Sequence, residues 1–85
     1  MNKRYILYIK KNCPFCVKAL ELLESESISF STIAFDNRPQ VLNEIKSIYQ
    51  WNTVPMVFEA SEDNNYKLVG GYTDLVATLE KNSNG

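Results

Sequence analysis

The sequence contains no histidine and only two cysteines, Cys13 and Cys16, among its 85 residues. Without histidine, neither a serine–histidine triad nor a cysteine–histidine protease pair can form. A structural zinc site usually takes four Cys or His ligands, and one copy of the chain supplies half of that set. A secreted disulfide scaffold would have more cysteines at wider spacing. These absences favour a reversible redox pair as the interpretation of Cys13 and Cys16.

An excess of one charge and long apolar runs are also missing. Nine Lys and Arg residues nearly balance ten Asp and Glu residues, and no basic cluster indicates binding to nucleic acid. The longest apolar run, Tyr5 to Ile9, is far shorter than the roughly 20 residues that cross a membrane. The N-terminal segment is too short and too polar for a signal peptide. We therefore expect a cytoplasmic protein that binds neither nucleic acid nor a membrane.

The remaining composition is ordinary for one small globular domain. Hydrophobic residues make up 45% of the chain and charged residues 22%, and the length suffices for one modest core. No repeat, low-complexity segment or interdomain linker interrupts the sequence. We expect a single domain over residues 1–85, in which residues 81–85 form a flexible tail.

Strand and helix patterns alternate along the first half of the chain. The apolar run 5–9 predicts a buried strand. Residues 14–25 carry an apolar stripe at helical spacing, and proline at the first position suits a helix start. Alternation over 28–35 predicts a second strand, and apolar residues at helical spacing over 41–49 predict an amphipathic helix.

The second half adds a hairpin and a last helix. Short strands are predicted around 57–58 and 66–69, joined by the polar turn 61–65, and a helix from about Thr73. The order is β-α-β-α-β-β-α, in which the first two strands are parallel through a right-handed crossover and the hairpin is antiparallel. The predicted fold is α/β, a four-stranded mixed sheet flanked by three helices on both faces.

The segment Cys13-Pro14-Phe15-Cys16 lies where the first strand ends and the first helix begins. A thiolate, rather than a thiol, attacks a disulfide. The free N–H groups and the dipole at a helix N-terminus favour a thiolate there, and Lys10 adds positive charge. Together these effects are expected to lower the thiol pKa from about 8.5 into the range of roughly 3.5–7.5.

The two-residue spacing predicts different roles for the two sulfurs. Cys13 at the helix start is the exposed nucleophile, and Cys16 on the apolar stripe is the buried thiol that resolves a mixed disulfide. Phe15 is expected to form an apolar collar beside the sulfur. Two alternatives remain open from the residues alone. In the first alternative, the cysteines are an accidental pair in the core. In the second, they are half of a metal site that a partner chain or ligand completes.

Three segments together resemble a known family. Cys13-Pro14-Phe15-Cys16 resembles the Cys-Pro-Tyr-Cys motif of dithiol glutaredoxins, Thr53-Val54-Pro55 resembles their Thr-Val-Pro segment, and Gly70-Gly71-Tyr72-Thr73-Asp74 resembles their Gly-Gly-x-x-Asp segment. The redox motif alone also fits thioredoxins, whereas the three segments in this order favour glutaredoxins. The resemblance covers about Tyr5 to Leu79 and implies a thioredoxin-like fold.

The resemblance implies that glutathione is the reductant and co-substrate and that no metal is needed. Pro55 is then expected in the cis form, with the Val54 backbone pairing with glutathione. Thr73 and Asp74 would hold the γ-glutamyl end, and Lys10 the glycine carboxylate. The glutathione-binding residues implied in this way are Lys10, Phe15, Thr53, Val54, Pro55, Gly71, Tyr72, Thr73 and Asp74, with Gln40 or Arg38 from the second helix.

Several of these residues also have ordinary structural interpretations. The segment 53–55 can be a strand entry, and 70–74 a hairpin exit followed by a capped helix. Gln40 and Arg38 can be solvated surface residues. Trp51 departs from the small or basic residues that the family often has before Thr-Val-Pro, and we expect it to pack against the second helix.

The function implied by the resemblance is the reduction of protein–glutathione mixed disulfides and of protein disulfides. Glutathione and disulfide-bearing proteins are then the partners of a monomer, and ribonucleotide reductase is a candidate among them. Two alternatives keep the same residues: a carrier of a glutathione-ligated iron–sulfur cluster, which Pro14 disfavours by resemblance, and a redoxin recycled by thioredoxin reductase. A non-catalytic interaction module would have no need of Cys13, Cys16 and Pro55 together.

Overall fold

The computed structural model describes residues 3–83, and its elements follow the predicted order. They are β1 (Arg4–Ile9), α1 (Pro14–Ser25), β2 (Phe30–Ala34), α2 (Pro39–Tyr49), β3 (Met56–Ala60), β4 (Tyr66–Gly70) and α3 (Tyr72–Ser83). The segment expected to be a tail from Lys81 is helical as far as Ser83. No proline or glycine interrupts it, and Lys81 in the last turn suits the helix dipole. The last two tail residues lie outside the described part.

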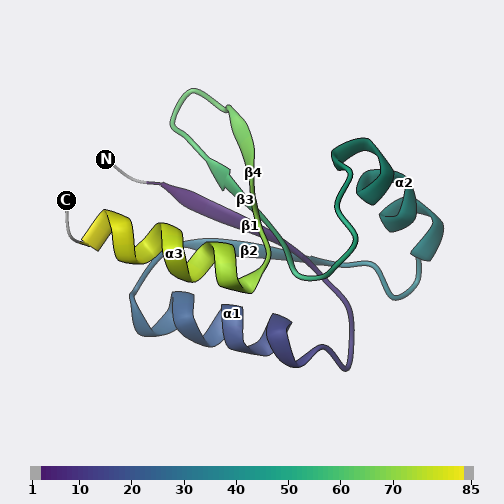
Figure 1. Cartoon of the computed structure of the whole chain (residues 1–85), viewed down its shortest axis with the longest axis horizontal. Coiled ribbons are helices and arrows are strands. Elements are labelled where there is room, and N and C mark those ends of the chain that lie inside the picture. The colour runs from purple at the N-terminus through teal and green to yellow at the C-terminus, as the bar shows by residue number, and fades with distance from the viewer. Residues whose placement is uncertain (1–2, 84–85) are drawn as a thin grey trace.

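The four strands form one mixed sheet in the order β2-β1-β3-β4 (Figure 1). β1 pairs with β2 in parallel and with β3 antiparallel, so that Leu7 lies between Thr32 and Val57. β3 and β4 form the antiparallel hairpin. The predicted arrangement of a four-stranded mixed sheet and three helices is therefore confirmed.

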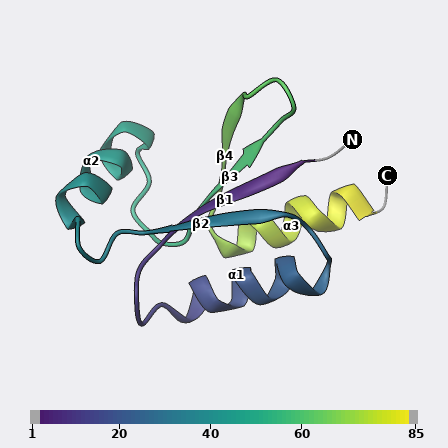
Figure 2. The ribbon, with the colours of Figure 1, turned by 180° about the vertical axis from the view of Figure 1, so that it is seen from behind.

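Alternation along β1 sends its side chains to two faces of the sheet. Tyr5 and Leu7 face α1 and α3, which lie together on one side of the sheet in both views (Figures 1 and 2). The buried core on this side consists of Tyr5, Leu7, Ala19, Leu23, Val57, Leu75 and Leu79. This core fixes the start of α1 against the end of β1, where the two cysteines lie.

A second core covers part of the opposite face and includes one residue of α2. Its buried members are Phe35, Leu42, Met56 and Phe58, and Tyr8 and Trp51 pack against them. The Tyr8 ring lies 5.1 Å from the Phe35 ring and 4.9 Å from the Phe58 ring, measured between centroids. Helices therefore cover both faces of the sheet, as the sequence predicts, but Leu42 is the only fully buried residue of α2 among those described.

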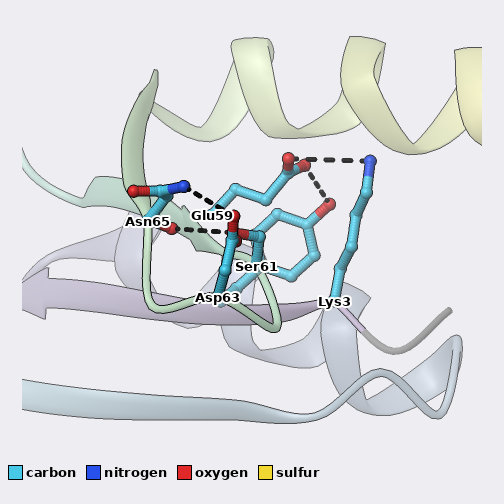
Figure 3. A network of polar contacts seen from close by, with 6 residues as sticks. Lys3, Glu59, Ser61, Asp63 and Asn65 are labelled. Carbon is cyan, nitrogen blue, oxygen red and sulfur yellow. Dashed lines mark hydrogen bonds and ion pairs between the residues drawn. The ribbon is translucent and has the colours of Figure 1, made fainter.

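The end of β1 away from the cysteines carries a small polar network (Figure 3). The Tyr5 hydroxyl donates to Glu59 Oε2 at 3.1 Å, and Lys3 Nζ lies 3.6 Å from Glu59 Oε1. Burial of Tyr5 and the negative charge of Glu59 raise the pKa of Tyr5 to about 12. The phenol is therefore held in its neutral, donating form.

The hairpin turn between β3 and β4 is closed by its own side chains, which Figure 3 also shows. The Ser61 hydroxyl donates to Asp63 Oδ1, and the Asn65 side-chain amide donates to Asp63 Oδ2 at 2.9 Å. These hydrogen bonds, the one from Ser61 first, hold the pKa of the Asp63 carboxyl below its ordinary value. The turn thus has a local structure that positions the hairpin without further packing.

Candidate redox active site

Cys13 is the N-cap of α1. Its backbone is extended, with φ −117° and ψ 98°, and its Sγ accepts a hydrogen bond from the Cys16 N–H at 3.1 Å. Pro14 occupies the first helical position, where its missing N–H leaves no hydrogen bond unmade. The sulfur therefore takes the place that a Ser or Asp oxygen takes in most N-caps, and an N–H group of the first turn points at it.

The two cysteines form a disulfide and differ in exposure. Their Cα atoms are 5.2 Å apart. Cys16 is 3% exposed and belongs to the buried side of α1, whereas Cys13 is half-buried. Cys13 is thus the sulfur that an incoming disulfide reaches, and Cys16 stands behind it, one helical turn further along.

The Thr53-Val54-Pro55 segment lies beside Cys13. The carbonyl oxygen of Val54 is 3.7 Å from Cys13 Sγ, and the Val54–Pro55 peptide bond is cis, as the resemblance implies. Thr53 is exposed, Val54 half-buried and Pro55 buried. Backbone groups of this segment are consequently within reach of a molecule that is bonded to the Cys13 sulfur.

The Gly70–Asp74 segment turns the chain from β4 into α3. Gly70 has φ +131°, a conformation that other residues rarely adopt. The Asp74 Oδ2 atom accepts a hydrogen bond from the Gly71 N–H at 3.0 Å and so caps the first turn of α3. One carboxylate oxygen of the exposed Asp74 is engaged in this way, and the other has no partner within the segment. Thr73 is exposed next to it.

Gly71 joins the last two segments. A Cβ placed on it would lie 3.7 Å from a carbon of the Trp51 ring, 3.8 Å from the Pro55 carbonyl oxygen and 3.9 Å from Thr53 Oγ1. The segments 53–55 and 70–74 are therefore in contact, although the β3–β4 hairpin separates them in sequence. Trp51 packs on the second core, which includes Leu42 of α2, and its ring also lies next to Gly71.

Aromatic side chains form a rim beside the disulfide. Phe15 is 53% exposed, and its ring centroid lies 5.9 Å from that of Tyr72 at the start of α3. Lys18 Nζ lies 5.2 Å from the centroid of the Phe15 ring. Sequence reasoning missed Lys18, although its position three residues after Phe15 in a helix is a signal for such a pair. The rim therefore combines apolar area with one positive charge.

Three residues were predicted for the glycine carboxylate, and none of them makes the contacts described above. Arg38 is the exposed N-cap residue of α2. Lys10 is exposed in the loop between β1 and α1, and Gln40 is exposed in the first turn of α2. The same loop is held to the end of β2 by the Lys11 N–H, which donates to Asp36 Oδ1 at 2.8 Å. The structure thus brings together Cys13, Cys16 and the segments 53–55 and 71–74, while Lys10 and Gln40 are exposed.

The described residues offer two further observations. Within residues 3–83, no three His, Cys, Asp or Glu side chains come close enough together to hold a metal ion. In the same part of the chain, none of the helices has the length and apolar character needed to span a membrane.

Sequence comparison relates the chain to one family. A family model described as Glutaredoxin matches residues 5–62. The glutaredoxin of Pseudomonas aeruginosa is 31% identical over 72 residues, which cover 85% of this chain and 80% of that protein. Glutaredoxin 1 of Rickettsia typhi is 38% identical over 72 residues, which cover 82% of this chain and 64% of that protein.

Solved structures of the same fold agree with this relationship. The crystal structure of glutaredoxin 1 from Francisella tularensis, in complex with cacodylate, matches with a TM-score of 0.74 and 27% identity over 98% of this chain and 99% of that chain. A thioredoxin-like protein matches with a TM-score of 0.63 at 18% identity and shows the fold alone.

Proposed function

The chain belongs to the glutaredoxin family and is a thiol–disulfide oxidoreductase, and we propose that it uses reduced glutathione as its electron donor. The observation that carries this proposal is the contact between the three segments of the site. A Val54 carbonyl oxygen 3.7 Å from Cys13 Sγ provides a backbone acceptor beside the reacting sulfur. The Gly70–Asp74 turn extends the same surface with exposed polar groups. Such a surface suits a short, extended, peptide-like thiol.

The first half-reaction is the transfer of glutathione to Cys13. The Cys13 thiolate attacks the glutathione sulfur of a protein–glutathione mixed disulfide, a new S–S bond forms, and the protein leaves as a thiolate that takes up a proton. A second glutathione thiolate then attacks the glutathione sulfur on Cys13. Glutathione disulfide is released, and the Cys13 thiolate is restored. This cycle requires Cys13 and leaves Cys16 unchanged.

Protein disulfides are proposed to follow a second route that uses both sulfurs. Cys13 forms a mixed disulfide with one sulfur of the substrate and releases the other as a thiol. The Cys16 thiolate then attacks Cys13 and releases the reduced substrate, which leaves the Cys13–Cys16 disulfide that the structure contains. Two glutathione molecules return this disulfide to the dithiol and leave as glutathione disulfide.

Glutathione is proposed to lie across the three segments. The Val54 backbone pairs with its cysteine residue, and the exposed Thr73 and the second carboxylate oxygen of Asp74 hold its γ-glutamyl end. Lys10, with Gln40 from α2, supplies charge and hydrogen bonds to its glycine carboxylate.

Five further residues complete the proposed site. We propose that Thr53, Pro55 and Gly71 contact glutathione beside the Val54 backbone, and that the Phe15 and Tyr72 rings, whose centroids are 5.9 Å apart, supply apolar contacts. The site residues all come from one chain, so we propose a monomeric catalytic unit. We further propose that the protein works in the cytoplasm on glutathionylated or disulfide-bearing proteins, ribonucleotide reductase being a candidate.

Turnover of a small glutathione mixed disulfide, coupled through glutathione reductase to NADPH, tests the proposal. We expect Cys13→Ser to abolish turnover and Cys16→Ser to retain it, because only the Cys13 thiolate forms the glutathione intermediate. Reduction of a protein disulfide should be lost in both variants. Wild-type protein that is inactive with glutathione but is recycled by thioredoxin reductase would contradict the choice of electron donor.

A further inference from the structure

β2 is an edge strand with little cover. It stands at one end of the strand order, and within residues 3–83 it pairs only with β1. Phe30 is partly buried, and every following residue of the strand is exposed, with Ile33 at 39%. Figure 2 shows β2 on the side turned to the viewer, free of helices along its outer edge. An uncovered edge presents backbone N–H and C=O groups to other chains.

The hydrogen bonds at the two ends of β2 define which residues turn their backbone groups outward. Ser29 O accepts from the Tyr5 N–H, and the Phe35 N–H donates to Ile9 O. Successive residues of a strand point their backbone N–H and C=O groups to opposite sides. The N–H and C=O groups of Ser31 and Ile33 therefore also point toward β1. The N–H and C=O groups of Phe30, Thr32 and Ala34 therefore point away from the sheet.

The β2 edge lacks the charged residues and prolines that usually prevent an edge strand from pairing with another chain. From Ser27 to Phe35 the sequence has no charged residue and no proline. The opposite edge strand β4 differs, since it contains Lys67, has an irregular register against β3 and is packed by α3. Natural edge strands use such charges and irregularities to prevent association. β2 is thus the edge of this sheet that remains open to pairing.

We propose that β2 is a self-association surface, at which two copies of this chain pair their β2 strands antiparallel about a two-fold axis through Thr32. In this register Thr32 lies opposite Thr32 of the second copy, and Phe30 lies opposite Ala34. Each of these residues has its backbone groups pointing outward, so the pairs form regular ladder hydrogen bonds. The sheets of the two copies become one continuous sheet.

The facing side chains favour a second copy over an unrelated partner. The register places the large Phe30 beside the small Ala34, and threonine beside threonine, which are compatible cross-strand pairs. No like charges meet, because the segment has none. Thr32 and Ala34 are exposed although their side chains face the layer of α1 and α3, so α1 does not cover the approach. A contact of one strand is small, and the dimer is therefore weak and reversible.

Sedimentation velocity over a protein concentration series from about 10 µM to about 1 mM tests the proposal. The wild type is expected to shift reversibly from the mass of one chain to that of two. Thr32→Lys and Thr32→Glu each place like charges opposite one another and should weaken the dimer at least about tenfold. Asn43→Lys adds the same charge on an exposed position of α2 and is the matched control, with wild-type behaviour expected.

Mixing the charged variants tests the two-fold register. Thr32→Lys and Thr32→Glu proteins in equal amounts place opposite charges at the axis, so association should return in the mixture. Far-UV circular dichroism shows whether each variant is folded. Amide exchange by NMR adds a residue-level readout: protection at Phe30, Thr32 and Ala34 should rise with protein concentration, while Ser31 and Ile33 are already protected by β1.

Three results would overturn the proposal. A wild type that keeps the mass of one chain throughout the series has no self-association surface. A dimer that persists unchanged in folded Thr32→Lys uses another surface. A mixture of the two charged variants that stays monomeric rules out the antiparallel register about Thr32. None of these results depends on glutathione turnover. They therefore test the self-association of β2 independently of the proposed function.

Discussion

At the scale of single residues, the adjacent Gly70 and Gly71 differ in whether the fold requires glycine at that position. Gly70 has φ +131°, and a Cβ there would collide with the Asp74 carboxylate that caps α3. Gly71 has no positive φ, and a Cβ on it would meet its neighbours at ordinary contact distances from 3.7 Å upward. The backbone conformation at position 70 therefore requires glycine. Neither the backbone nor the packing requires glycine at position 71.

This difference predicts unequal effects of alanine. Gly70→Ala should lower the free energy of unfolding by about 2–3 kcal/mol, because it combines backbone strain with the loss of room for the cap. Gly71→Ala should change it by no more than about 0.5 kcal/mol. Urea denaturation of both variants measures the difference. Equal losses in the two variants would contradict the proposed role of the Gly70 conformation.

Tyr5 is a second residue whose environment has a measurable consequence. Burial first, and the neighbouring Glu59 charge second, raise its pKa from 10.0 to about 12. The neutral form is favoured in the folded state, so this contribution to stability is complete below pH 10 and is lost as the pH rises through 12.

Tyr5→Phe should therefore change how stability depends on alkaline pH. At pH 8 the variant is expected to be less stable by about 1.5–3 kcal/mol, because the hydrogen bond to the Glu59 carboxylate is lost. As the pH rises from 10 to 12 the difference should shrink, since phenylalanine cannot ionise. Urea denaturation at a series of pH values measures this. Tyr8, whose pKa is also raised, is present in both proteins and serves as a common background. Parallel pH profiles for the two proteins would contradict the argument.

At the scale of secondary structure elements, α2 is the least enclosed helix. Of its described residues only Leu42 is fully buried, while Val41 is 40% and Ile48 76% exposed. It ends at Gln50, whose left-handed conformation terminates the helix. A helix with so few buried apolar side chains is expected to open more easily than α1 or α3.

The attachment of α2 should depend on one side chain. Leu42→Ala removes a buried contact with the second core and is expected to lower the free energy of unfolding by about 2–4 kcal/mol. Ile48→Ala on the exposed side should change it by at most about 0.5 kcal/mol. Thermal and urea denaturation of both variants provide the values. A loss below about 1 kcal/mol in Leu42→Ala would mean that α2 contributes little to the stability of the whole domain.

At the scale of the whole molecule, the two cores share one sheet. β1 contributes Leu7 to the core beneath α1 and α3 and Tyr8 to the other, and β3 divides Val57 and Phe58 in the same way. Loss of either core exposes the strands that carry the other. We therefore expect the domain to unfold as one cooperative unit.

The single tryptophan makes this cooperativity measurable. Trp51 packs on the second core, whereas most of the helical signal comes from α1 and α3 on the other face. Trp51 fluorescence and far-UV circular dichroism should give coincident urea transitions, because both report on the same all-or-none event. Different midpoints for the two signals would show that the cores unfold separately.

The sequence by itself determined the element order, the parallel pairing of the first two strands, the antiparallel hairpin and the nature of the redox pair. Periodicity, Pro14 at the start of α1 and the spacing of Cys13 and Cys16 are local properties, and local properties are readable along the chain. The same is true of the different exposure of the two cysteines, because it follows from their positions on one amphipathic helix.

The tertiary structure decided which distant segments of the chain contact one another. Packing between distant segments determines four features of the molecule. These are the approach of the Val54 carbonyl to Cys13, the contact of Gly71 with Trp51 and Thr53, the partial burial of α2 and the open edge of β2. The sequence also predicted too early an end for α3, since nothing local marks how far a helix without a breaker continues. Such contacts arise from the fit of whole elements, and no residue pattern of a single segment contains that information.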